Sequence, residues 1–146
     1  MTIQLREMDF DPCTELASYQ DQVVGRRGQY GAVVSFVGTM RDFNEGRAVQ
    51  SMTLEHYSGM TEKNLEQISV EARRRWDILD TLIIHRVGEV RPNDPIVLVA
   101  VWAAHRAAAF EACRYLIEEL KARAPFWKNE RLRETSRWVK RNTPAA

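Results

Sequence analysis

The chain has 146 residues, of which 45% are hydrophobic and 28% are charged, and its formal net charge is +1. These values are typical of one globular domain, so we expect residues 1–146 to form a single domain with a frayed tail at 142–146. The small net charge argues against nucleic acid as a partner, and no apolar run is long enough to cross a membrane. The N-terminus is unlike a signal peptide, so the cytoplasm is the expected location.

The first elements are a strand and a helix. Residues 2–8 alternate between apolar and polar types, which predicts a short strand. Asp11 or Thr14 is a candidate N-cap for a following helix that extends to about Val24.

Two strands with a loop between them are predicted next. Residues 30–37 are rich in β-formers and mostly apolar, which predicts a central strand. Residues 38–46 are polar and turn-like, so we expect a loop there. Residues 49–57 alternate again, and we expect a half-buried strand that pairs with the preceding strand.

A second helix is predicted after Gly59, with Thr61 as a candidate N-cap. Its apolar positions recur at helical spacing, at Leu65, Ile68, Ala72 and Trp76. The run Arg73–Arg75 falls near its end, where positive charge suits the helix dipole. A nucleic-acid patch is the less favoured interpretation of these arginines.

Two strands and a long helix complete the pattern. Residues 81–90 predict one strand, and after a Pro-rich turn residues 96–103 form the most continuously apolar stretch, which predicts the centre of the sheet. The last helix is expected to begin at His105, with one apolar face at Phe110, Cys113, Ile117, Leu120 and Ala124. Residues 137–139 predict a short edge strand. The order predicts an α+β fold with a mixed, mostly antiparallel sheet and three main helices.

The most informative segment is Lys121–Lys128, where Pro125 ends the last helix. Phe126 and Trp127 lie between the two lysines, so both ammonium groups can be aimed at one spot beside an apolar wall. A lysine in such a place can act as an acid, a base or a nucleophile. The alternative is a helix end whose lysines bind the last carbonyls and whose aromatic rings fill the core.

Two further cationic clusters follow strand ends, at Thr39-Met40-Arg41 and at His105-Arg106. Together with the lysines they predict a pocket of positive potential that suits a phosphate-bearing substrate. Each residue also has a structural alternative, such as an ion pair between Arg41 and Asp42.

Metal and thiol chemistry are not indicated. The histidines and cysteines lack the spacing of metal ligands, so no metal site is expected. His56 and His85 lie in strand patterns, where structural roles are favoured. Cys13 and Cys113 are expected to be buried or half-buried free thiols, with a disulfide as the less favoured alternative.

Five motifs, taken in order, resemble the catalytic (large) subunit family of molybdopterin synthase. They are 36–42 (FVGTMRD), 54–62 (LEHYSGMTE), 84–89 (IHRVGE), 104–106 (AHR) and 120–128 (LKARAPFWK). The resemblance implies an α/β-hammerhead fold, a homodimer within a heterotetramer, no bound cofactor, and a small ubiquitin-like partner whose C-terminal Gly-Gly is a thiocarboxylate. It also implies sulfur transfer to cyclic pyranopterin monophosphate, which forms the dithiolene of molybdopterin.

The same resemblance implies which residues act. Lys121 and Lys128 would be catalytic, and substrate contacts would come from a larger set: Thr39, Met40, Arg41, His105, Arg106, Lys121, Lys128, Asn129 and Glu130. The competing hypothesis is a non-catalytic α+β binding module that adds a partner's tail or strand to its sheet edge.

Overall fold

A computed structural model describes residues 1–25, 28–44, 47–48, 50–124, 126–131 and 136–138. The helices are α1 (Pro12–Tyr19), followed by a π-helical turn at Gln20–Val24, then α2 (Met60–Arg75) and α3 (Arg106–Arg123). The strands are β1 (Thr2–Arg6), β2 (Ala32–Thr39), β3 (Phe43–Asn44), β4 (Arg47–Ala48), β5 (Ser51–His56), β6 (Asp80–Arg86), β7 (Gly88–Val90), β8 (Pro95–Ala103), β9 (Phe126–Arg131) and β10 (Ser136–Trp138).

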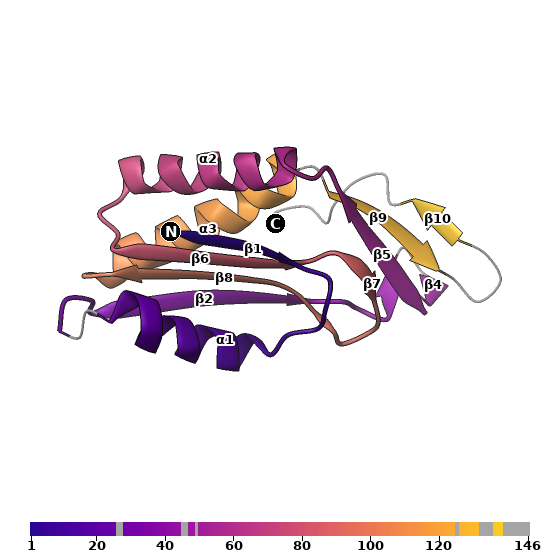
Figure 1. The fold of residues 1–146 in the computed structure, drawn as a ribbon, viewed down its shortest axis with the longest axis horizontal. Coiled ribbons are helices and arrows are strands. Elements are labelled where there is room, and N and C mark those ends of the chain that lie inside the picture. The colour runs from indigo at the N-terminus through magenta and orange to yellow at the C-terminus, as the bar shows by residue number, and fades with distance from the viewer. Residues whose placement is uncertain (26–27, 45–46, 49, 125, 132–135, 139–146) are drawn as a thin grey trace.

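Two four-stranded sheets form the framework (Figure 1). The first has the order β1-β6-β8-β2, in which only the β1–β6 pair is parallel. The second has the order β10-β9-β5-β7 and is antiparallel, and β3 and β4 form a small hairpin beside it. Helices α2 and α3 cover one face of the first sheet and α1 covers the other.

The core forms on both faces of the first sheet. In β8, Val97, Val99 and Val101 face α2 and α3, whereas the alternating residues Leu98 and Trp102 face α1. Strands buried on both faces need apolar residues at every position, which explains the continuous apolar run. The sequence prediction of β8 as the centre of the sheet is therefore confirmed.

Several boundaries agree with the sequence predictions. Asp11 is the N-cap of α1, where its side chain accepts a hydrogen bond of 3.0 Å from the backbone N–H of Cys13. The helical stretch continues through the π-helical turn to Val24 and ends at Gly25, whose φ is 50°. The edge strand predicted over 137–139 corresponds to β10 (Ser136–Trp138). Val139 and the tail 142–146 lie outside the described residues.

Three predictions about strands and helices are wrong. Strand β5 pairs with β7 and β9 rather than with β2, because the β3–β4 hairpin, which begins with β3 inside the predicted loop 38–46, carries the chain into the second sheet. The strand predicted over 81–90 is divided into β6 and β7 where Gly88 takes a φ of 84°. The N-cap of α2 is Gly59, and Thr61 is buried inside the first turn.

Two predictions of burial are also wrong. Phe110 is 62% exposed, because it lies on the side of α3 that faces away from the sheet. Cys13 is exposed beside the N-cap of α1, whereas Cys113 is buried in the core, and both are free thiols.

Candidate functional site

The first and second sheets meet where the chain leaves β6. Arg86, the last residue of β6, is 5% exposed and donates a hydrogen bond of 2.7 Å to the carbonyl of Glu89. Its guanidinium also lies 3.3 Å from a carboxylate oxygen of Asp9. The backbone N–H of Val87 donates to the carbonyl of Arg6 at 2.9 Å. These contacts hold the junction rigidly against β1.

The two predicted lysines reach this junction from different elements. Lys121 lies in the last turn of α3, and Lys128 is the third residue of β9. The helix ends at Arg123, and the N–H of Phe126 donates to the carbonyl of Ala124 at 2.9 Å, which turns the chain directly into β9. Both lysines are half-buried. Pro125 lies outside the described residues.

A stacked pair of rings lies close to both lysines. The imidazole of His85 stacks on the ring of Phe126, with centroids 3.8 Å apart and planes 10° from parallel. Burial, together with the positive charges of Lys128 and Lys121, lowers the pKa of His85 to about 4, against a hydrogen bond with the Arg86 carbonyl that raises it. The charges of both lysines therefore act on one neutral imidazole.

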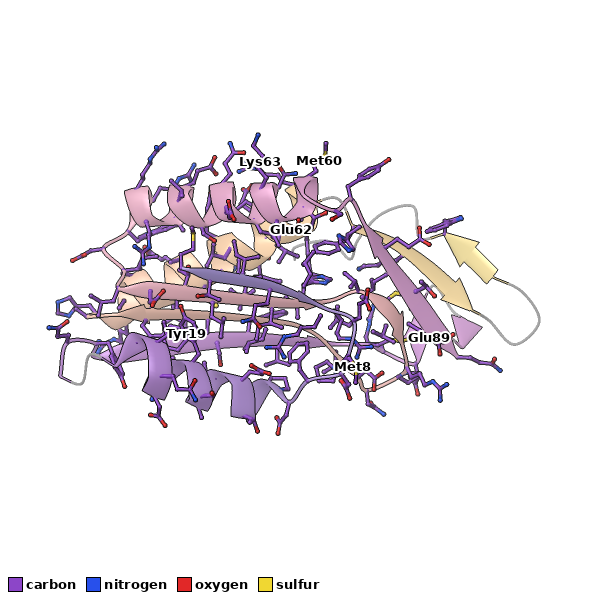
Figure 2. All side chains as sticks on the ribbon, in the orientation of Figure 1. Met8, Tyr19, Met60, Glu62, Lys63 and Glu89 are labelled. Atoms are coloured by element: carbon purple, nitrogen blue, oxygen red, sulfur yellow. The ribbon has the colours of Figure 1, made fainter. Side chains whose placement is uncertain are left out.

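His56 adds a second imidazole to this region. It is the last residue of β5, where it pairs with Phe126, and its Nδ1 lies 3.8 Å from a carboxylate oxygen of Glu62. Glu62 caps the first turn of α2 through the N–H of Gly59. Figure 2 shows Glu62 on the inner side of α2 and Lys63 on its outer side. A pocket of about 340 Å³ opens here, lined by Glu55, His56, Tyr57 and Trp138.

The predicted cluster after β2 lies at the same end of the first sheet. Thr39 and Arg41 are exposed. Met40 is 4% exposed and packs with Met52, Leu54 and Val90 under the second sheet. Backbone hydrogen bonds of Met40 with Asp94 and Asn93 fix this turn. Thus the side chain of Met40 supports the site from within the core, whereas Arg41 is presented to solvent.

The His105-Arg106 pair lies elsewhere. His105 is the N-cap of α3 and Arg106 its first residue, and both are exposed. Lys121 is 15 residues further along the same helix, which at 1.5 Å per residue is about 22 Å. One copy of the chain therefore brings Lys121 and Lys128 together but keeps His105 and Arg106 apart from them.

The remaining predicted contacts lie in β9. Asn129 pairs with Thr53 and Glu130 pairs with Met52, so both belong to the second sheet. Their side chains lie outside the described part of the structure.

Sequence reasoning assigned His85 and His56 to structural roles and so missed their closeness to the lysines. The useful signal was the position of His85 at a strand end three residues before Gly88, whose positive φ turns the chain between sheets. Among the described residues, no group of three His, Cys, Asp or Glu side chains is placed to hold a metal ion. The described helices include none that is long and apolar enough for a membrane span.

The fold and the site define a class: an α+β protein with two amine side chains gathered where two sheets join. Residues 8–123 match the family model described as MoaE protein, and the chain belongs to this family. The molybdopterin synthase catalytic subunit of Ralstonia nicotianae is 51% identical over 138 residues, which cover 94% of this chain and 76% of that protein.

Another relative and a solved structure belong to the same family and are similar over nearly the whole chain. The molybdopterin synthase catalytic subunit of Pseudomonas aeruginosa is 51% identical over 139 residues, covering 95% of this chain and 90% of the relative. The solved structure of the molybdopterin biosynthesis MoaE protein from Burkholderia ambifaria has a TM-score of 0.80 at 46% identity, and covers 99% of this chain and 92% of that one. The family resemblance and the fold class inferred from sequence are confirmed. The chain is thus an enzyme rather than a binding module.

Proposed function

We propose that this chain transfers sulfur from the C-terminal thiocarboxylate of a small ubiquitin-like carrier subunit to cyclic pyranopterin monophosphate, forming the dithiolene of molybdopterin. The observation that carries the proposal is the convergence of Lys121 and Lys128 on one buried imidazole. The names of the relatives support it, since they are molybdopterin synthase catalytic subunits, and a subunit implies a partner. We place this reaction in the cytoplasm.

In this reaction the thiocarboxylate of the carrier is the nucleophile. The chain itself must supply positive charge and proton transfer. At each delivery the thiocarboxylate sulfur bonds to a side-chain carbon of the pterin as a carbon–oxygen bond at that carbon breaks, which opens the cyclic phosphate in one delivery and expels water in the other. Water then hydrolyses the resulting thioester, which leaves the sulfur on the pterin and releases the carrier as its carboxylate. Two such deliveries give the two sulfurs of the dithiolene. Lys121 is assigned to the incoming thiocarboxylate and to proton transfer, and Lys128 to the pterin or its phosphate. No thiol of this chain is required, which fits the buried position of Cys113.

Arg41, His105 and Arg106 are assigned to the phosphate, which Arg can bind through two parallel hydrogen bonds. Because α3 separates His105 and Arg106 from Lys121 by about 22 Å, a complete site needs these two residues from a second copy. The homodimer implied by the family resemblance can supply them.

Strand β2 is the edge that favours such a dimer. It pairs only with β8 among the described strands, and Ser35, Phe36 and Val37 in its middle are exposed. An exposed edge with apolar side chains is a template for pairing with another strand. If β2 pairs antiparallel with its symmetry mate about Phe36, the Ala32 end of one copy lies beside the Thr39 end of the other.

This pairing brings the separated residues closer together. The N–H of Gly31 donates to the carbonyl of Ala103 at 3.0 Å, so the start of α3 is fixed next to the beginning of β2. The partner's His105 and Arg106 would then approach Arg41 at the junction of the sheets, the end to which α3 and β9 bring the lysines (Figure 1). The dimer therefore accounts for the cationic residues that one copy leaves apart.

The test is dithiolene formation by Lys121→Ala and Lys128→Ala variants, assayed separately with thiocarboxylated carrier and cyclic pyranopterin monophosphate. We expect each to lose about 100-fold or more in kcat, in the range of lost electrostatic and acid–base catalysis. Lys63→Ala is the matched control, because Lys63 is an exposed lysine on α2. Near-normal turnover in both site variants would overturn the assignment.

A further inference from the structure

His85 is a buried titratable side chain that the proposed chemistry leaves without a task. It is 4% exposed and is the next-to-last residue of β6, at the junction of the two sheets. A histidine in this position has two features that a residue used only for filling space lacks: a flat ring and a directional hydrogen bond. Both are used.

The hydrogen bond fixes the ring to the first sheet. His85 Nδ1 lies 2.6 Å from the carbonyl oxygen of its neighbour Arg86, so Nδ1 carries the proton and donates it. Arg86 is itself held by Glu89 and Asp9. The orientation of the imidazole is therefore set by contacts that belong to the first sheet and its connection to β7.

The flat face of the ring sets the position of β9. His85 stacks on Phe126 at 3.8 Å, and Phe126 is the first residue of that strand. Residues two apart in a strand project to the same face, so Lys128 rises from the face on which the stack lies. Lys121 precedes Phe126 by five residues, across the end of α3. Phe126 therefore connects the chain segments that carry the two lysines, and its ring stacks on the imidazole that both lysine charges affect.

We infer that His85 is a positioning residue for sulfur transfer: its imidazole holds Phe126 by stacking and thereby fixes where Lys121 and Lys128 place their ammonium groups. The inference rests on the proposed function. His85 need not touch the substrate. Burial and the charges of Lys128, Lys121 and His56 keep the pKa of His85 low, so at neutral pH the ring adds no further repulsion to the cationic site.

Two variants separate the ring from the hydrogen bond. His85→Phe keeps an aromatic face for Phe126 but loses the donor to Arg86, whereas His85→Gln keeps a donor and loses the face. With thiocarboxylated carrier and cyclic pyranopterin monophosphate, we expect His85→Phe to stay within about threefold of the wild-type kcat. We expect His85→Gln to lose about tenfold or more in kcat with KM little changed, because small misplacements of reacting groups are costly. Equal activity of the two variants, or greater activity of His85→Gln, would overturn the inference.

A second measurement does not depend on turnover. The pKa of His85 is followed by NMR of the ¹⁵N-labelled ring in the wild type and in the Lys121→Ala and Lys128→Ala variants. Loss of a nearby positive charge should raise that pKa in both variants, and Lys63→Ala should leave it unchanged. If neither site variant shifts it, the positioning role is overturned. If the wild-type complex forms no dithiolene, the proposed function fails instead, so the two failures are distinguishable.

Discussion

Acid should destabilise this protein through His85, and the size of the effect follows from its environment. The ordinary pKa of histidine is 6.5, and burial together with nearby lysines lowers that of His85 to about 4. In the unfolded chain the ring regains its ordinary pKa, so between these values the unfolded state binds the proton more readily. The contribution of neutral His85 to stability is complete above pH 6.5 and is lost as the pH falls toward 4.

The magnitude comes from the interval between the two pKa values. At about 1.36 kcal/mol for each pH unit, a folded pKa of about 4 corresponds to about 3 kcal/mol of stability lost. For a domain whose total stability is on the order of 5–15 kcal/mol, this is a large share. Most of the loss is expected between about pH 6 and pH 4.

The assay is urea unfolding of the wild type and of His85→Phe at several pH values across this window. Phenylalanine cannot take a proton, so the difference between the two proteins isolates His85. The wild type should lose about 3 kcal/mol more than the variant. Glu71, whose hydrogen bond from Arg123 lowers its pKa to about 2, is common to both proteins and titrates mainly below the window. Parallel curves for the two proteins would refute the reasoning.

Three further predictions concern other parts of the molecule. Gly31→Ala should lower the free energy of unfolding by about 1–3 kcal/mol in urea melts, because the added Cβ would overlap the backbone carbonyl oxygen of Ala104; an unchanged midpoint would contradict this close approach. Val37→Lys places a charge on the exposed edge of β2 and should convert a dimer to a monomer in analytical ultracentrifugation, with loss of turnover; an intact dimer would exclude the β2 pairing. In the native protein a thiol reagent should label the exposed Cys13 quickly and Cys113 only after denaturation, since burial raises the pKa of Cys113 to about 11; equal native labelling would contradict the core packing.

The elements that could be predicted from the sequence are those whose pattern of apolar residues is local. The continuous apolar run of β8 and the helical spacing in α3 reflect burial along one element, so they can be recognised without knowing the partners. The pairing of β5 could not be recognised in the same way. Its alternation is that of any half-buried strand, and its neighbours β7 and β9 are fixed by Gly88 and by the end of α3, far away in the sequence.

For the site, too, the local sequence predicts some features and not others. Lys121 and Lys128 could be expected to converge because a proline and two aromatic residues separate them within eight positions. Their closeness to His85 depends on the stack with Phe126 across two sheets, which no local pattern specifies. The length of α3, in contrast, already implies that His105 and Arg106 lie far from Lys121, and the rise of 1.5 Å per residue is enough to infer it.

The most direct test of the account is complementation between two inactive variants. Lys121→Ala and Arg106→Ala chains are co-expressed, and dithiolene formation is measured with thiocarboxylated carrier and cyclic pyranopterin monophosphate. If the site combines Lys121 of one copy with Arg106 of the other, random pairing makes half of the dimers mixed. Each mixed dimer has one intact site, so about a quarter of the wild-type activity should return. If the mixture is as inactive as either variant alone, the cationic residues do not meet across the dimer, and the account is contradicted.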